Sequence, residues 1–235
     1  MLAQRVAALV AAVAAVAGVV VGAAFGVWWV GVLTLVVVGG GLWAGLVAPR
    51  LGHAEVRALR FVGPARAADG REARLLNLVE GLAPSAGLPR PQCLVLDDPS
   101  ANALVLGRDP RHGWLVVTTG LLERLSLMEV EGVVAHCLVE LRDGSTVRPT
   151  LALALGNGRG LAHTTADPHL AADLSAVSLT RYPPGLASAL RTILAGRAEG
   201  APALPRGSAS VLGPLWLAPE GEAAIQARIE ALDEM

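Results

Sequence analysis

The sequence predicts an α+β domain, mostly helical with a small β-sheet, preceded by a two-helix transmembrane hairpin. Three observations support this: two long uncharged apolar stretches near the N-terminus, three short apolar runs separated by turn residues, and several longer segments with helical periodicity. We divide the 235 residues into a hairpin over 1–50, a linker over 51–70 and a globular domain over 71–235. This length suffices for one domain with its own core beside the smaller N-terminal part.

The N-terminal segment has the composition of a membrane anchor. Residues 6–25 and 27–47 contain no charged side chain, and each stretch is close to the roughly 20 residues that cross a bilayer as a helix. Arg5 precedes the first stretch and Arg50 follows the second, so the positive-inside rule places both ends in the cytosol. We therefore expect a multi-pass protein of the cell membrane whose soluble domain faces the cytosol.

A signal peptide is the alternative interpretation of the same segment. Residues 1–5 would then be the positive n-region, and the Ala-rich run after them the apolar h-region. Cleavage would leave the second apolar stretch as an anchor and would place the remainder outside the cell. Arginine on both flanks of the apolar segment favours the hairpin.

The composition of the whole chain limits its class of function. The formal net charge is −1, so there is no positive field to attract a polyanion, and nucleic-acid binding is not expected. The two cysteines, Cys93 and Cys137, are too few for a disulfide framework and favour a reducing compartment. We expect Cys93 to be a small buried apolar residue, as free cysteines usually are.

The first half of the domain predicts a helix followed by a sheet. Residues 71–86 carry apolar side chains at the i, i+3, i+4, i+7 spacing of a helix with one buried face. Turn sequences rich in Asp and Pro then separate three short apolar runs, which predict a three-stranded sheet: residues 93–96, 103–106 and 114–118.

The second half of the domain predicts helices. Ser126 and Glu129 form a capping box at the start of a helix that continues to residue 141. Two further helices, over 171–179 and 185–194, are separated by consecutive prolines, and an amphipathic helix over 220–232 follows.

Several short motifs follow one another in a distinctive order along this domain. They are LPRP at 88–91, a turn with Asn-Ala at 102–103, TTGLLERL at 118–125, EVEGVVAH at 129–136, Ala-Asp at 172–173, Leu-Thr at 179–180, the run 184–190, and RIEAL at 228–232. In order and spacing the chain resembles the HtpX-like family of membrane zinc metalloendopeptidases, gluzincin-type enzymes related to CAAX prenyl proteases. The resemblance implies a zincin-like metallopeptidase domain and zinc as its cofactor.

The resemblance also implies a particular active-site motif. Family members carry His-Glu-x-x-His on one helix, and the two His together with a later Glu bind zinc. Residues at i and i+4 lie on one helix face and can reach one metal, while the intervening Glu activates the water.

This chain departs from that motif in a specific way. Residues 136–140 read HCLVE, so His136 matches the first ligand, Cys137 stands at the general-base position and Glu140 stands at the second His. His169, four residues before Asp173, stands where the family has Glu. Two imidazoles and one carboxylate remain, so the resemblance predicts a permuted set of metal ligands: His136, Glu140 and His169. The fourth position is either open or taken by Cys137.

The departure leaves two hypotheses for activity. A general base contributes about 10² to 10⁴ in rate, and a thiol is a poor substitute for a carboxylate. We therefore expect a catalytically impaired homologue that keeps a cleft for a peptide or protein ligand; the alternative is an active, divergent zinc metalloendopeptidase that uses the permuted ligands.

Two further residues gain expected roles from the resemblance. Asp173 corresponds to a carboxylate that orients a ligand His through its other ring nitrogen, although a helix-surface acid is the alternative. Asn102 corresponds to a cleft residue that positions a substrate backbone, although an ordinary turn Asn is the alternative.

Overall fold

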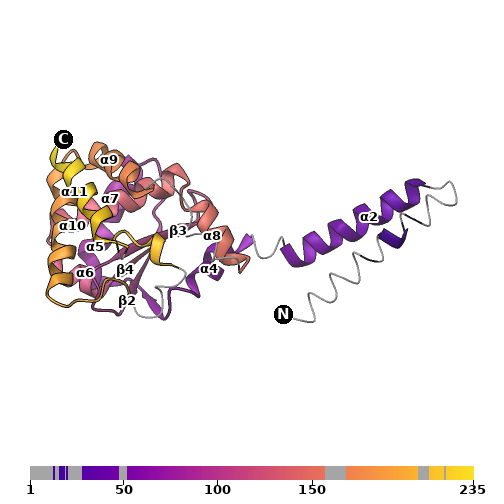
Figure 1. Ribbon diagram of the computed structural model, residues 1–235, viewed down its shortest axis with the longest axis horizontal. Helices are drawn as coiled ribbons and strands as arrows, with labels where there is room; N and C mark the ends of the chain where they lie inside the picture. Colours follow the sequence, from indigo (N-terminus) through magenta and orange to yellow (C-terminus); the bar gives the residue numbers. More distant parts are fainter. Residues whose placement is uncertain are drawn as a thin grey trace. The chain divides into compact units, whose positions relative to one another are not determined.

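The computed structural model describes residues 13, 16–18, 20, 28–47, 52–156, 168–205, 212–219 and 221–235. The chain forms two compact units, Met1–His53 and Ala54–Met235 (Figure 1). The first unit contains helix α2 (Trp28–Leu42), which has no charged residue and continues as one π-helical turn over Trp43–Val47. Within the described residues, no helix is both long enough and apolar enough to cross a membrane. The first expected span, residues 6–25, lies mostly outside the described residues.

A four-stranded mixed sheet lies at the centre of the second unit. Its strands are β1 (Ala65–Ala67), β2 (Gln92–Leu96), β3 (Ala103–Gly107) and β4 (Gly113–Thr118), in the order β1-β2-β4-β3. β2 and β4 are parallel, and the other two pairs are antiparallel. The three expected strands are therefore confirmed, and β1 is an addition. β1 was not predicted because three residues without a β-branched or aromatic side chain give no strand signal.

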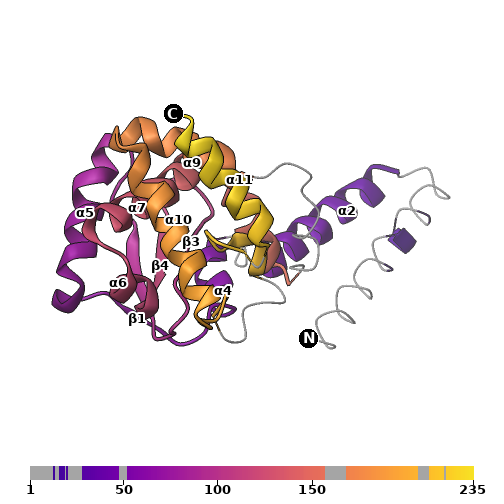
Figure 2. The same ribbon diagram turned by 60° about the vertical axis from the view of Figure 1, so that its left-hand side comes forward.

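One face of the sheet is covered by a layer of helices, three of which carry the candidate site. The layer consists of α5 (Ala73–Ser85), α7 (Leu127–Asp143), α9 (Pro168–Thr180), α10 (Pro183–Ala198) and α11 (Glu222–Asp233). α7 packs against α5, α9, α10 and β3, so it runs through the middle of the main core (Figures 1 and 2). These five helices confirm the expected mostly helical α+β fold.

The opposite face of the sheet is covered by shorter elements. α4 (Ala54–Leu59) and α8 (Val147–Ala154) pack on it, and the apolar side chains of Leu104, Leu106 and Trp216 meet there in a second cluster. α4 and β1 come from the stretch that the sequence assigned to a linker. The short helices α4, α6 (Thr119–Arg124) and α8, and the 3₁₀ turns Gly70–Glu72 and Gly213–Leu215, were not predicted, because so few residues show no clear period.

The ends of α7 fix the position of the candidate ligands. The backbone N–H of Ser126 donates to Oε2 of Glu129 at 2.8 Å, which confirms the expected capping box. The helix ends at Gly144, whose φ of 75° is left-handed and so favours glycine. Gly132 lets α10 approach closely, because a Cβ there would lie 2.7 Å from the backbone nitrogen of Leu186.

Candidate metal centre

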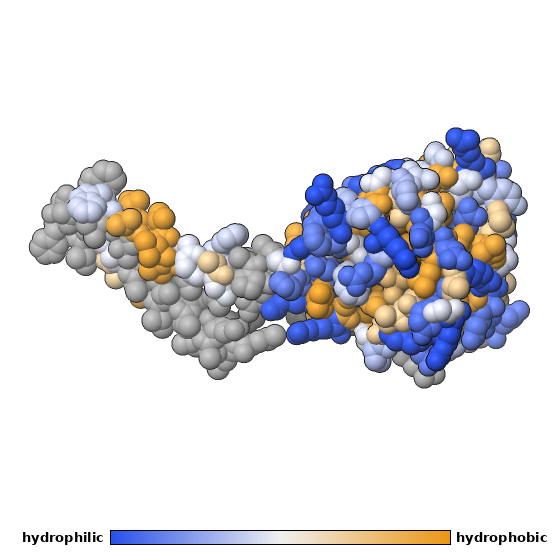
Figure 3. Space-filling model, turned by 180° about the vertical axis from the view of Figure 1, so that it is seen from behind, coloured by the Kyte–Doolittle hydropathy of each residue, from blue (hydrophilic) through white to orange (hydrophobic). Residues whose placement is uncertain are grey.

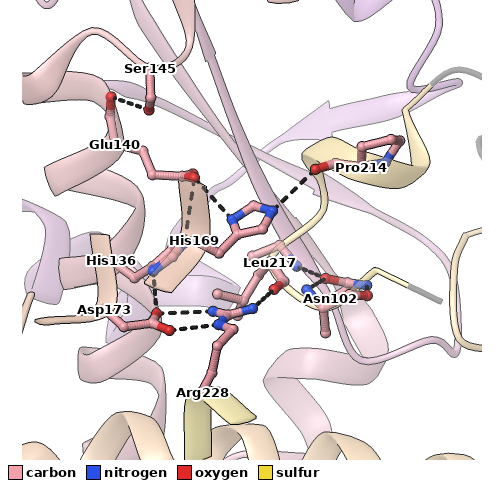
Figure 4. Close-up of polar contacts among 11 residues, drawn as sticks. Asn102, His136, Glu140, Ser145, His169, Asp173, Pro214, Leu217 and Arg228 are labelled. Atoms are coloured by element: carbon pink, nitrogen blue, oxygen red, sulfur yellow. Dashed lines mark hydrogen bonds and ion pairs between the residues drawn. The ribbon is translucent and has the colours of Figure 1, made fainter. Parts of the chain in front are cut away.

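Three side chains from two helices converge in the main core. His136 and Glu140 lie one turn apart on α7, and His169 lies near the start of α9 (Figure 4). One donor atom from each lies within 4.8 Å of the other two. Oε1 of Glu140 is 3.6 Å from Nε2 of His136 and 3.0 Å from Nδ1 of His169. All three residues are buried, so the structure brings together the three ligands that the sequence suggested.

The far nitrogen of each imidazole is held by another group. Nδ1 of His136 lies 2.7 Å from Oδ1 of Asp173, and Nε2 of His169 lies 3.1 Å from the backbone oxygen of Pro214 (Figure 4). A carbonyl oxygen only accepts, so Nε2 of His169 carries a proton, and Nδ1 is the ring nitrogen that faces Glu140. Both rings therefore present their other nitrogen to Glu140, as oriented metal ligands do.

Arg228 completes this network, although the sequence did not assign it a role. It reaches Asp173 from α11 with two hydrogen bonds, from Nε at 2.6 Å and from Nη2 at 2.9 Å, and its Nη1 donates to the backbone oxygen of Leu217 at 2.5 Å. Its side chain is 1% exposed. The sequence signal that could have identified Arg228 as buried is its spacing. It lies three residues after Ile225 and one before Ile229, on the buried face of α11.

The charges of the cluster compensate one another. Burial lowers the pKa of His136, but the negative charges of Glu140 and Asp173 outweigh it and raise that pKa to about 9. Burial raises the pKa of Glu140, but the charge of His136 opposes it and holds this pKa well below its usual value. Burial also raises the pKa of Asp173, but the charges of His136 and Arg228 outweigh this effect and lower that pKa below its usual value. Without a metal, a proton on His136 thus supplies the positive charge facing Glu140.

The donor set fits a zinc ion. Two ligands at about 2.1 Å from a tetrahedral ion lie about 3.4 Å apart, close to the separations that Glu140 makes with the two imidazoles. The 3.6 Å separation from His136 is longer than a hydrogen bond and leaves room for an ion to join the two donors. Two imidazoles and one carboxylate, each imidazole oriented by another group, match the ligands of open zinc sites.

Cys137 is not among the donor atoms that converge. Its thiol is buried, and burial first, then the charge of Glu140, raises its pKa well above the usual value. A thiol that stays protonated at neutral pH is a poor general base. Cys93 lies in the main core, which confirms the expectation that it is a small buried apolar residue.

Asn102 uses its amide inside the protein. Its Nδ2 donates to the backbone oxygens of Ala203 and Ala218, and its Oδ1 accepts from the backbone N–H groups of Ala103 and Ala218. The side chain is fully buried and its two donors and two acceptor sites are occupied. Asn102 therefore ties the edge of β3 to the segment 212–219, and its contact with a substrate backbone stays a prediction.

Comparisons with known proteins bear on the part of the site that α7 carries. Residues 69–149 match the description "Peptidase family M48". A "Protease HtpX homolog" of Dictyoglomus thermophilum is 37% identical over 161 residues, covering 51% of this chain and 53% of the relative. Another from Levilactobacillus brevis is 42% identical over 88 residues, covering 37% of this chain and 30% of the relative. This part of the chain is similar to the HtpX-like members of peptidase family M48. The aligned part spans about half the length of the first relative and less than a third of the second.

The family match and the geometry support different parts of the site. The M48 match includes β2 to β4 and the whole of α7, and therefore His136 and Glu140. It ends before His169 and Asp173 on α9. Their assignment to an M48 site in this chain rests on the convergence seen in the structure.

Proposed function

We propose that this chain is a membrane-anchored, HtpX-like metallopeptidase homologue that binds one Zn²⁺ through His136, Glu140 and His169 and has impaired peptidase activity. The observation that carries the proposal is the convergence of these three donors within 4.8 Å. Because Asp173 and Pro214 already hold the far ring nitrogens, the chain loses little conformational entropy when it takes up the ion.

The chemistry available to this chain's own residues stops short of efficient hydrolysis. When bound, zinc in such sites polarises a carbonyl group and lowers the pKa of a coordinated water. His136, Glu140 and His169 would hold the ion, and Asp173 with Arg228 would keep the ring of His136 in place. No carboxylate stands at position 137 to take the proton of the water, and the raised pKa of Cys137 leaves its thiol unable to do so.

The second candidate function is an active, divergent zinc metalloendopeptidase. The permuted ligands support it, since two imidazoles and one carboxylate give the ion the same ligand charge as in the family pattern. It predicts slow proteolysis that a chelator abolishes, whereas the impaired homologue predicts zinc without turnover and a cleft that serves to bind a peptide or protein ligand.

The proposed location follows from the N-terminal composition. Two uncharged apolar stretches, residues 6–25 and 27–47, would form a membrane hairpin with the second unit in the cytosol. α2 is consistent with this proposal, because its large described side chains, such as Val32, Val36 and Val37, are apolar and exposed.

Metal analysis of the 235-residue chain in detergent tests the proposed site. We expect one zinc per chain, and its loss in His136→Ala and in His169→Ala. His112→Ala is the matched control, because His112 is exposed and contacts Asp109 outside the site. Circular dichroism would verify that each variant is folded. Wild-type chain without zinc after growth in zinc-supplemented medium, or folded variants that retain it, would contradict the proposal.

A further inference from the structure

The arginines of α4 and α8 differ from most arginines in the described part of the chain. Elsewhere arginine side chains are usually paired, as in Arg124 with Glu199 and the exposed pair Arg191 with Asp233. Among the described residues, Arg60 directly after α4 and Arg148 in α8 have no ion pair or side-chain hydrogen bond, and both are exposed. Arg57, partly exposed on α4, also lacks such a partner there.

These two helices form a single surface. α4 packs against α8, and both pack against β3 (Figure 1). Ala54 and Ala58 face inward and are fully buried. Figure 3 shows apolar and hydrophilic side chains interleaved on the face of the second unit that it presents.

The exposed apolar side chains of this surface are large. Val56 is 45% exposed, Phe61 follows α4 and is 41% exposed, and Leu155 follows α8 and is 51% exposed. Acidic side chains are missing from the outward face of the two helices. Glu55 is the single acidic residue of α4, but it is buried and lies 3.7 Å from Arg108, and α8 contains none.

Unpaired arginines beside exposed apolar side chains match the chemistry of an anionic lipid surface. Apolar residues enter the boundary between headgroups and acyl chains, while arginines keep their charged ends among lipid phosphates. Each basic residue near such a surface adds to the attraction. A protein partner would have to supply both an apolar and an acidic patch, whereas the anionic membrane supplies both together.

We propose that one surface of the second unit lies against the anionic headgroups of the membrane. This α4–α8 surface consists of Val56, Arg57, Arg60, Phe61, Arg148 and Leu155. The inference rests on the proposed membrane anchor, because α4 begins seven residues after Val47, the end of the uncharged stretch. Contact on this side would orient the unit on the bilayer, beyond what a tether alone does.

Fluorescence quenching on the 235-residue chain in vesicles tests the contact. A fluorophore is attached at Val56→Cys, or as a control at Asn77→Cys on the exposed side of α5, since Cys93 and Cys137 are buried. The vesicles are pure phosphatidylcholine or an equimolar mixture with phosphatidylglycerol, each with a spin-labelled lipid as membrane quencher and iodide as aqueous quencher.

We expect lipid quenching at position 56 to be several-fold stronger in the anionic vesicles than in the neutral ones, with iodide quenching dominant at position 77. Combining Arg60→Asn with Arg148→Asn should remove this difference between vesicles. Arg71→Asn with Arg181→Asn is the matched control, because those exposed arginines also lack a described side-chain partner and lie outside α4 and α8.

Two results would overturn the proposal. Equal access of iodide to positions 56 and 77 in both vesicles would show that the surface faces water, as it would if a protein were its partner. Lipid quenching at position 56 that is equal in neutral and anionic vesicles and unchanged by the arginine substitutions would exclude recognition of anionic headgroups.

Flotation separates this inference from the anchor. A chain that does not float with neutral vesicles at high salt lacks the proposed hairpin. Binding to anionic vesicles that still depends on Arg60 and Arg148 would then support the α4–α8 surface by itself.

Discussion

Arg228 and Asp173 form a two-point ion pair inside the second unit, with separations of 2.6 and 2.9 Å between their nitrogen and oxygen atoms. The pair joins the C-terminal helix α11 to α9, and Asp173 in turn contacts His136 of α7. A residue near the C-terminus therefore helps to orient a candidate metal ligand almost a hundred positions earlier in the chain.

Removing Arg228 should destabilise the fold strongly. Arg228→Met leaves the Asp173 carboxylate buried with less compensation, and breaking a buried pair costs about 3–5 kcal/mol. Arg191→Met is the control, because it breaks a pair with Asp233 in which both side chains are about half exposed, and should cost less than about 1 kcal/mol. Urea unfolding of the chelator-treated chain measures the free energy of unfolding of each variant. Equal losses of this free energy would show that Arg228 is no more important for stability than a surface residue.

Neutralising Asp173 should weaken zinc binding while leaving the three donors in place. Asp173→Asn removes the charge that faces Nδ1 of His136, and losing such a partner lowers metal affinity by about 10- to 100-fold. Competition with a chromophoric chelator measures the affinity. Asp109→Asn makes the same change beside the exposed His112 and should leave zinc affinity unchanged. A wild-type affinity in folded Asp173→Asn would contradict the assigned role.

A carboxylate at position 137 should restore the missing base. Cys137→Glu is expected to raise zinc-dependent peptide hydrolysis by up to about 10²–10⁴ over the wild-type chain. Cys137→Gln is the matched control, since it has the same size and no base. Turnover of a quenched fluorescent peptide, with and without chelator, distinguishes them. If zinc-loaded Cys137→Glu is no faster than Cys137→Gln, some feature other than the base limits activity, such as the burial of the site.

The metal-free protein should lose stability in alkali through His136. Its folded-state pKa of about 9 lies above the ordinary value of 6.5. A group with a raised pKa contributes stability that is fully present below the unfolded-state pKa and is lost as the pH rises through the folded-state value. The urea midpoint of the chelator-treated chain should therefore fall between pH 6.5 and 9. In folded His136→Gln this fall should be absent, and an identical fall there would assign it to another group.

Glu72 should contribute to the stability of the fold at neutral pH and lose this contribution in acid. The hydrogen bond from Arg66 lowers the pKa of Glu72 to about 2, from an ordinary 4.5. A lowered pKa contributes stability that is present above the unfolded-state pKa and is lost as the pH falls through the folded-state value. Glu72→Gln should therefore be less stable than the wild type above pH 4.5, and the two should converge as the pH approaches 2. Glu80→Gln, in an exposed pair with Arg90, should change the curve little. Urea unfolding at a series of pH values measures the difference.

Local sequence signals predicted most of the fold because they act within a few residues. The capping box at Ser126 and Glu129 and the helical period after it placed α7, and with it the i, i+4 spacing of His136 and Glu140. Turn residues between apolar runs predicted β2, β3 and β4. β1, α4 and α8 were missed because each is too short for a period and is held by packing on the sheet.

By itself, then, the sequence determined the order of the main helices and strands, the HtpX-like motifs and the residue types of the permuted ligand set. Only the tertiary structure decided that His169 turns towards Glu140, that Asn102 binds the backbone of Ala218, and that Arg228 reaches Asp173. The physical reason is distance along the chain: residues dozens of positions apart meet because α9, α11 and the segment 212–219 pack around α7 and the edge of β3. No local period or spacing encodes the contacts that such packing creates.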